Sequence, residues 1–174
     1  MKENIRQALN TYLPDDINVK KVSFVSDDFH ARFSARAKLY RYRILNQKDP
    51  DVFLRDRSWW LPQRLDLSAM RKAAQRLRGK KDFSAFAQEA STYKSCVRRL
   101  KRIDISRNGS QVIIDIEAEG FLRGMARNIV SLLVDVAQGR RSEKSVARLV
   151  KTRNRSLLGR PAPARGLYLW RVSY

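Results

Sequence analysis

Residues 120–139, GFLRGMARNIVSLLVDVAQG, place an arginine in a segment that is otherwise mostly apolar. Apolar side chains recur there at the helical spacing of three or four residues: Leu122, Met125, Ile129, Leu132 and Val136. This pattern predicts one long helix with an apolar stripe. Arg127 falls roughly opposite the stripe, at about 100° per residue, among small and apolar residues, so this second side is also expected to be packed. A guanidinium in such a place needs an anionic partner, because a buried unpaired charge is very costly.

No acidic residue lies three or four positions from Arg127 to pair with it along the helix. Two explanations are therefore open. A distant aspartate of the same core could neutralise the guanidinium, since buried arginines are usually structural. Alternatively, the arginine belongs to a functional site and binds a carboxylate or phosphate. The rest of the chain favours the second explanation.

Positive charge dominates the composition. The 174 residues include 37 Lys and Arg against 17 Asp and Glu, a formal net charge of +20. Such an excess points to a polyanionic partner. Nucleic acid is favoured because arginine outnumbers lysine, and a guanidinium forms bidentate hydrogen bonds with phosphate and stacks on bases. An anionic membrane surface is the alternative, although no amphipathic basic helix stands out as an anchor and no apolar run is long enough to span a bilayer.

Cys96 and His30 are the only residues of their kinds in the chain. A lone cysteine excludes an internal disulfide and suits a reducing compartment, so we expect a cytoplasmic protein. It also excludes a zinc site built on cysteines. One histidine argues against a histidine-based metal site or a Ser-His-Asp triad, so no metal is expected.

The length predicts a single domain, residues 1–174, with a substantial core. Helices are predicted over residues 2–13, between an N-cap at Asp66 and Gly79, and after an N-cap at Ser142. Strands are predicted over 17–25, 38–45, the short SWWLP piece, the two arms of a hairpin that turns at Asn108-Gly109, and the final LYLWRVSY. Strands in runs with intervening helices predict an α+β fold, a mostly antiparallel sheet with helices packed on one face.

Four motifs follow one another along the chain: DDFHARFSARAKLYRYRI, KDFSAF, GFLRGMARNIV and PAPARGLYLWRVSY. Together, in this order and spacing, they resemble the C-terminal half of the tRNA pseudouridine synthase A family over nearly the whole chain. Departures are small: Lys81 stands where the family commonly has His, and Ser131 where it often has Gly. The resemblance implies half of the pseudouridine synthase fold.

The resemblance also implies an activity, the isomerisation of uridine to pseudouridine at positions 38 to 40 in the anticodon arm of tRNA. Such enzymes use neither an organic cofactor nor a metal. An aspartate attacks the target nucleotide, and the base detaches, turns and rejoins its sugar through carbon. The base must be flipped into a pocket, which calls for an aromatic platform and for basic groups on the flanking backbone.

Four residues match positions of the family's active site. By this resemblance, Tyr40 stacks on the target base and is placed to take part in its deprotonation. Arg127 pairs with the catalytic aspartate, which explains why it lacks a local partner. Leu167 belongs to the wall of the substrate pocket, and Phe121 helps to shape the same cavity.

The family's catalytic aspartate lies in a segment reading Arg-Thr-Asp-Ala-Gly-Val-His, upstream of the region that this chain matches. The chain contains no Arg-Thr and no Asp-Ala dipeptide, and none of its own aspartates is assigned as nucleophile. We therefore expect a front-truncated chain whose N-terminal half acts in cis or in trans, and which is inactive alone. Its exposed face should contain Tyr40 and Arg127, and pairing into a homodimer could cover it.

Basic residues outside the pocket are candidates for RNA contact: Arg32, Arg41, Arg98, Arg99, Lys101, Arg160 and Arg165. Arg98, Arg99 and Lys101 form a basic run at a strand start, which a solvated edge strand guarded by charge explains equally well. Arg160 and Arg165 lie in a basic loop before the last strand and suit a clamp on the tRNA backbone. A non-catalytic RNA-binding module and a subunit of a split synthase are the alternative functions.

Overall fold

The computed structural model describes all residues, Met1–Tyr174, in two compact units, residues 1–34 and 35–174. The first unit contains helix α1, Lys2–Tyr12, as predicted, followed by an extended segment and a turn-rich loop. The strand predicted over residues 17–25 is wrong. No neighbouring strand offers a ladder there, and the N–H and carbonyl of Val19 instead bond the side chain of Asn10, at 2.7 and 3.0 Å.

The second unit is built on a six-stranded sheet with the order β2-β1-β5-β4-β3, and β6 also pairs with β1. The strands are β1 (Ala37–Leu45), β2 (Trp59–Trp60), β3 (Gly79–Asp82), β4 (Val97–Asn108), β5 (Gln111–Ala118) and β6 (Leu167–Ser173). Every pairing is antiparallel except that of β1 with β2. One edge of β1 bonds β5, and its other edge is shared by β6 and β2.

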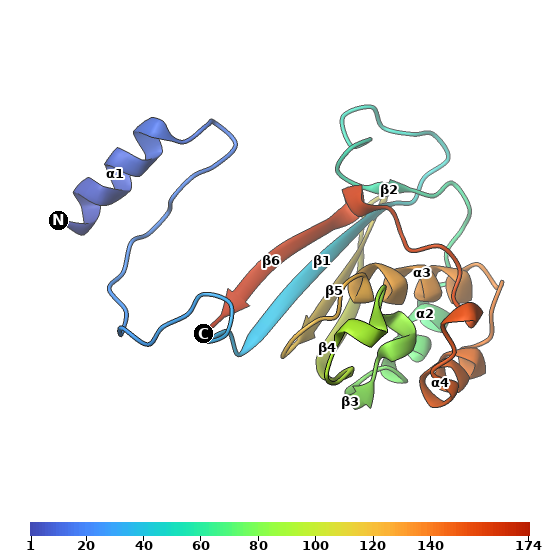
Figure 1. Ribbon diagram of the computed structural model, residues 1–174. Helices are drawn as coiled ribbons and strands as arrows, with labels where there is room; N and C mark the ends of the chain where they lie inside the picture. The colour runs from blue at the N-terminus through green and yellow to red at the C-terminus, as the bar shows by residue number, and fades with distance from the viewer. The chain divides into compact units, whose positions relative to one another are not determined.

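Three helices cover one face of this sheet (Figure 1): α2 (Leu67–Gln75), α3 (Met125–Ala137) and α4 (Glu143–Thr152). The predicted α+β fold is thus confirmed. The core lies between the helices and the sheet, where the alternating positions of β1, β4 and β5 turn Tyr42, Ile103 and Ile114 toward Met125 and Ile129 of α3. None of the helices has both the length and the hydrophobicity that crossing a membrane requires.

The local signals for the hairpin and for α2 are confirmed. The β4–β5 hairpin turns at Gly109, whose φ of 56° lies in the left-handed region that glycine tolerates. The carboxylate of Asp66 caps α2 by accepting from the N–H groups of Ser68 (2.8 Å) and Ala69 (3.0 Å). Ser142 is the N-cap residue of α4, as predicted, although its side chain accepts no capping hydrogen bond.

The predicted long helix begins later than the sequence suggests. Residues 120–124 lie outside α3, because Gly124 adopts a φ of 77° and turns the chain just before Met125. The last turn ends as predicted, before Gly139 at a φ of 72°. Because of this turn at Gly124, residues 121–124 form part of a pocket wall instead of the first turn of the helix.

The sheet face away from α2, α3 and α4 is polar. Arg41 makes a two-pronged ion pair with Asp115, at 2.8 and 2.7 Å, and its guanidinium lies 4.0 Å from the ring centre of Trp170. Farther along this face, Arg102 bridges Asp104 and Glu117. Arg41 and Arg43, which alternate with Tyr40 and Tyr42 along β1, therefore carry guanidinium groups to this face, whereas Leu39 and Leu45 are buried.

Candidate active site

One pocket of about 580 Å³ contains all four residues that the sequence assigned to the substrate site: Tyr40, Phe121, Arg127 and Leu167. They come from four separate parts of the second unit, namely β1, the turn before α3, the first turn of α3, and the start of β6. Further lining comes from Gln88, Tyr93 and residues 122–126. The fold thus gathers into one cavity side chains that are as much as 127 positions apart, since 167 minus 40 is 127.

Tyr40 is held by the sheet with its side chain in the pocket. It lies opposite Ile116 of β5 and Leu169 of β6, on the side of the sheet that faces the helices. Its ring meets that of Phe121 edge to face, with the centroids 4.8 Å apart and the planes at 79°. Such edge-to-face packing is a preferred aromatic geometry. The contact fixes the orientation of a half-buried phenol at the pocket surface.

Arg127 bonds a backbone carbonyl and no carboxylate. Its Nε donates to the carbonyl oxygen of Ala162 at 2.5 Å, and the Ala162 N–H returns a 3.2 Å bond to the Arg127 carbonyl. None of the ion pairs of the chain includes Arg127. The first explanation for the arginine, neutralisation by a distant aspartate of the same core, is therefore wrong. The Ala162 carbonyl orients the guanidinium, while its terminal nitrogens make no hydrogen bond within the chain.

The second side of α3 is packed, as predicted, and the element that packs there is the loop before β6, which positions Leu167. Ser131 donates to the Arg160 carbonyl at 2.7 Å, and the buried phenol of Tyr42 donates to the Pro163 carbonyl at 2.7 Å. Burial raises the pKa of Tyr42 above its ordinary value, against the opposing influence of Arg127 and Arg165. Tyr42 therefore remains a hydrogen-bond donor at neutral pH.

The opposite wall is formed by residues 83–96 and is tied to α3. Asn128, which is 2% exposed, donates to the Phe86 carbonyl at 2.7 Å. The N–H of Gln88 donates to the Arg123 carbonyl at 2.8 Å, and the N–H of Arg123 donates to the Tyr93 hydroxyl at 2.9 Å. Gln88 and Tyr93 are pocket residues that the sequence analysis missed. The only signal for Gln88 was its position just after the KDFSAF motif.

The pocket combines an aromatic and apolar lining with positive charge. Tyr40, Phe121 and Leu167 offer flat or apolar surface, while Arg127 and Arg123 bring two guanidinium groups to the lining. Arg123 is paired with Glu89 at 3.0 Å, whereas Arg127 has no anionic partner. A cavity of this kind suits a planar base together with an anionic group at Arg127.

The predicted RNA-contact residues are spread over both units. Arg98 contacts the pocket wall, since its guanidinium lies 5.8 Å from the Tyr93 ring centre and also bonds the carbonyls of Ser95 and Val97. Arg99 is half exposed and lies 3.3 Å from Glu119. Lys101 is exposed, and its Nζ lies 3.5 Å from the Arg36 carbonyl.

The remaining candidates differ in how freely they could reach a phosphate. Arg160 and Arg165 are exposed in the loop that leads to Leu167. Arg41 lies on the sheet face away from the helices and is already bonded to Asp115. Arg32 belongs to the first unit and stacks at 5.5 Å on Phe33. RNA contact by these residues stays a prediction.

Comparison with known proteins agrees with this geometry. A family model described as tRNA pseudouridine synthase matches residues 73–174. The chain therefore belongs to the tRNA pseudouridine synthase family, a family of isomerases. It is 40% identical over 174 residues to tRNA pseudouridine synthase A of Oceanobacillus iheyensis, covering 99% of this chain and 69% of that protein. The enzyme of the same name from a Thermotoga species is 43% identical over 173 residues, covering 99% and 70%.

Proposed function

We propose that this chain forms the base-binding side of an active site that converts uridine to pseudouridine at positions 38 to 40 in the anticodon arm of tRNA. The observation that carries the proposal is the convergence of Tyr40, Phe121, Arg127 and Leu167 in one pocket. Its volume of about 580 Å³ lies within the usual range for small-molecule sites, roughly 300–1,000 Å³. A flipped nucleotide is a substrate of this size.

The apolar lining would hold the flipped base. The ring of Tyr40 serves as the stacking surface, and its hydroxyl is the group placed to take part in deprotonation of the base. Phe121 keeps the Tyr40 ring at a fixed angle through the 4.8 Å edge-to-face contact. Leu167 closes the opposite side and excludes water from the base. These roles need no metal or organic cofactor.

Arg127 would bind the carboxylate of the nucleophilic aspartate. A guanidinium with free terminal nitrogens matches a carboxylate in a forked geometry, and its Nε bond to Ala162 leaves those nitrogens available. The aspartate would come from the N-terminal half of the family's fold, in cis or in trans. Docking of that half, or pairing with a second copy of the chain, would cover the face that contains Tyr40 and Arg127.

The test measures pseudouridine in an unmodified tRNA transcript. The 174-residue chain alone should form none, and addition of a companion half that carries the Arg-Thr-Asp-Ala-Gly segment should restore turnover. In the restored enzyme, Arg127→Ala should lower turnover by on the order of 10²–10³-fold, as loss of a preorganised electrostatic contact does, with little change in tRNA affinity. Arg127→Lys is the control that keeps the positive charge but cannot form the two-pronged guanidinium–carboxylate contact.

Three results would contradict the proposal. Pseudouridine formed by the chain alone would show that its own residues supply the nucleophile. Normal turnover by Arg127→Ala would remove the ion-pair role. Tight tRNA binding without turnover in the presence of the companion half would identify the chain as a non-catalytic RNA-binding module.

A further inference from the structure

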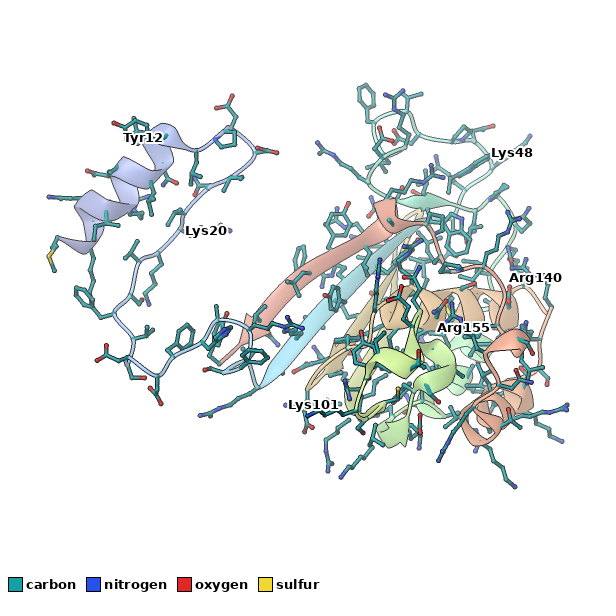
Figure 2. The ribbon with its side chains drawn as sticks, viewed as in Figure 1. Tyr12, Lys20, Lys48, Lys101, Arg140 and Arg155 are labelled. Carbon is teal, nitrogen blue, oxygen red and sulfur yellow. The ribbon has the colours of Figure 1, made fainter.

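Helix α4 carries a row of three exposed cations, Lys144, Arg148 and Lys151. Their spacings of four and three residues place them on one side of the helix, along about 10 Å at 1.5 Å per residue. Neither an ion pair nor a side-chain hydrogen bond engages any of the three. We name these residues the α4 basic row, and Figure 2 shows nitrogen-tipped side chains projecting from the α4 segment.

The opposite side of α4 fixes the orientation of this row. Val146 and Leu149 are buried in the core, at 0% and 1% exposure. Glu143, in the first turn, pairs with Arg76 at 2.8 Å and links α4 to the end of α2. The helix therefore cannot rotate to bury its cations, and the α4 basic row presents a fixed positive surface.

The row differs from the arginines around it, which have anionic partners. These pairs are Arg76 with Glu143, Arg140 and Arg141 with Asp135, and Arg153 with Asp82. Three aligned cations without counter-charges repel one another. An external polyanion would relieve that repulsion and release its own condensed counterions.

The chain that follows α4 connects the row to the pocket. Arg155 reaches back to the carbonyl of Ala87, in the residue 83–96 wall beside Gln88. The exposed Arg160 and Arg165 come next, and Leu167 then enters the pocket. The segment from α4 to the pocket rim thus carries two unpaired arginines, Arg160 and Arg165, whereas Arg153, which follows α4 directly, is paired with Asp82.

We propose that the α4 basic row binds the phosphate backbone of the same RNA whose base enters the pocket, at a distance from the modified nucleotide. This inference rests on the proposed function. It adds a contact surface to the basic residues predicted from the sequence, none of which lies in α4. RNA fits better than a membrane, because the apolar residues Val146 and Leu149 are buried in the core and cannot insert into lipid.

The experiment compares two triple variants of the 174-residue chain with equal net charge. Lys144→Gln/Arg148→Gln/Lys151→Gln removes the row. Lys48→Gln/Arg55→Gln/Arg57→Gln removes three exposed cations from the loop before β2, far from α4 in Figure 1. Dissociation constants for an unmodified tRNA transcript are measured by fluorescence anisotropy at several salt concentrations, with thermal melting to verify that both variants are folded.

Loss of three phosphate contacts should weaken tRNA binding about tenfold or more near 0.1 M salt and reduce the slope of log Kd against log salt by about 2 to 3. The loop variant should change both quantities much less. Equal effects of the two variants, with tight binding by the unaltered chain, would overturn the α4 contact and leave the proposed function standing. Absence of tRNA binding by the unaltered chain even in the presence of the companion half would overturn both.

A second arm uses vesicles of anionic phospholipid. If removal of the row abolishes vesicle binding and leaves tRNA binding unchanged, the row is a membrane contact and the RNA proposal is refuted. If tRNA binding alone is weakened, the proposal is supported.

Discussion

Gly166 lies directly against the ring of Tyr42, at the point where the loop enters β6. A Cβ atom at this position would lie 2.7 Å from two ring carbons of Tyr42 and 2.8 Å from the Arg43 carbonyl oxygen. The ring cannot withdraw easily, because Tyr42 is fully buried and donates to the Pro163 carbonyl at 2.7 Å. Gly166→Ala should therefore force the loop, the ring or both to move.

The size of the effect follows from these contacts. Carbon atoms pack best at about 3.5–4.0 Å, so a displacement of about 1 Å is needed. Overpacking of this kind costs about 1–3 kcal/mol, and loss of the Tyr42 hydrogen bond adds about 1 kcal/mol. The lower entropy of the unfolded alanine chain offsets about 0.4–1 kcal/mol. The expected loss in free energy of unfolding is about 1–3.6 kcal/mol.

Urea unfolding followed by tryptophan fluorescence measures this loss, since Trp59 packs edge to face on Tyr42 at 6.3 Å. Gly159→Ala is the matched control in the same loop, because a Cβ there would meet only an Asp135 oxygen, at 4.0 Å. It should change the free energy of unfolding by less than about 0.5 kcal/mol, as surface substitutions usually do. If both variants are equally stable, the close approach of Gly166 to Tyr42 is not a constraint on the fold.

Two further predictions concern side chains that hold the pocket walls. Because burial raises the Tyr42 pKa, the unfolded chain loses this proton at lower pH than the folded chain, and stability should fall by up to about 1.4 kcal/mol per pH unit as the pH rises above about 10. Tyr42→Phe should lessen this decline in a comparison of urea unfolding at pH 8 and pH 11; an unchanged decline would contradict the assignment. Asn128→Ala should lower the free energy of unfolding by about 1–3 kcal/mol, because the Phe86 carbonyl loses its buried donor. Amide hydrogen exchange should then become faster in residues 83–96. Unchanged exchange there would contradict the idea that the hydrogen bond from Asn128 holds this wall against α3.

Elements whose causes are local were predictable from the sequence. The Asn108-Gly109 dipeptide determines the turn of the hairpin. The Asp66 carboxylate marks the start of α2, because it accepts hydrogen bonds from N–H groups only two and three residues further along the chain. The pocket residues Tyr40, Phe121, Arg127 and Leu167 could be assigned through the resemblance of four motifs. Their meeting in one cavity required the sheet pairing and the packing of the last loop.

Features that depend on distant partners were not predictable from local pattern. Strand β3 reads GKKD and has no apolar alternation, so it exists only because Gly79–Asp82 pair with Leu100–Val97 of β4. Residues 17–25 have a composition typical of a strand but form none, because no neighbouring strand pairs with them. The hydrogen bond from Arg127 to the Ala162 carbonyl likewise could not be predicted, because every residue type has a backbone carbonyl.

The pairing of β6 with β1 has a consequence for synthesis. A nascent chain can assemble the β4–β5 hairpin and α3 before the carbonyls of Ala162 and Pro163 and the side chain of Leu167 have been synthesised. Until then Arg127 and Tyr42 lack their acceptors, and the outer edge of β1 is open to wrong pairing. Loss of residues 162–174, by premature termination or proteolysis, would thus remove part of the cavity wall together with strand β6.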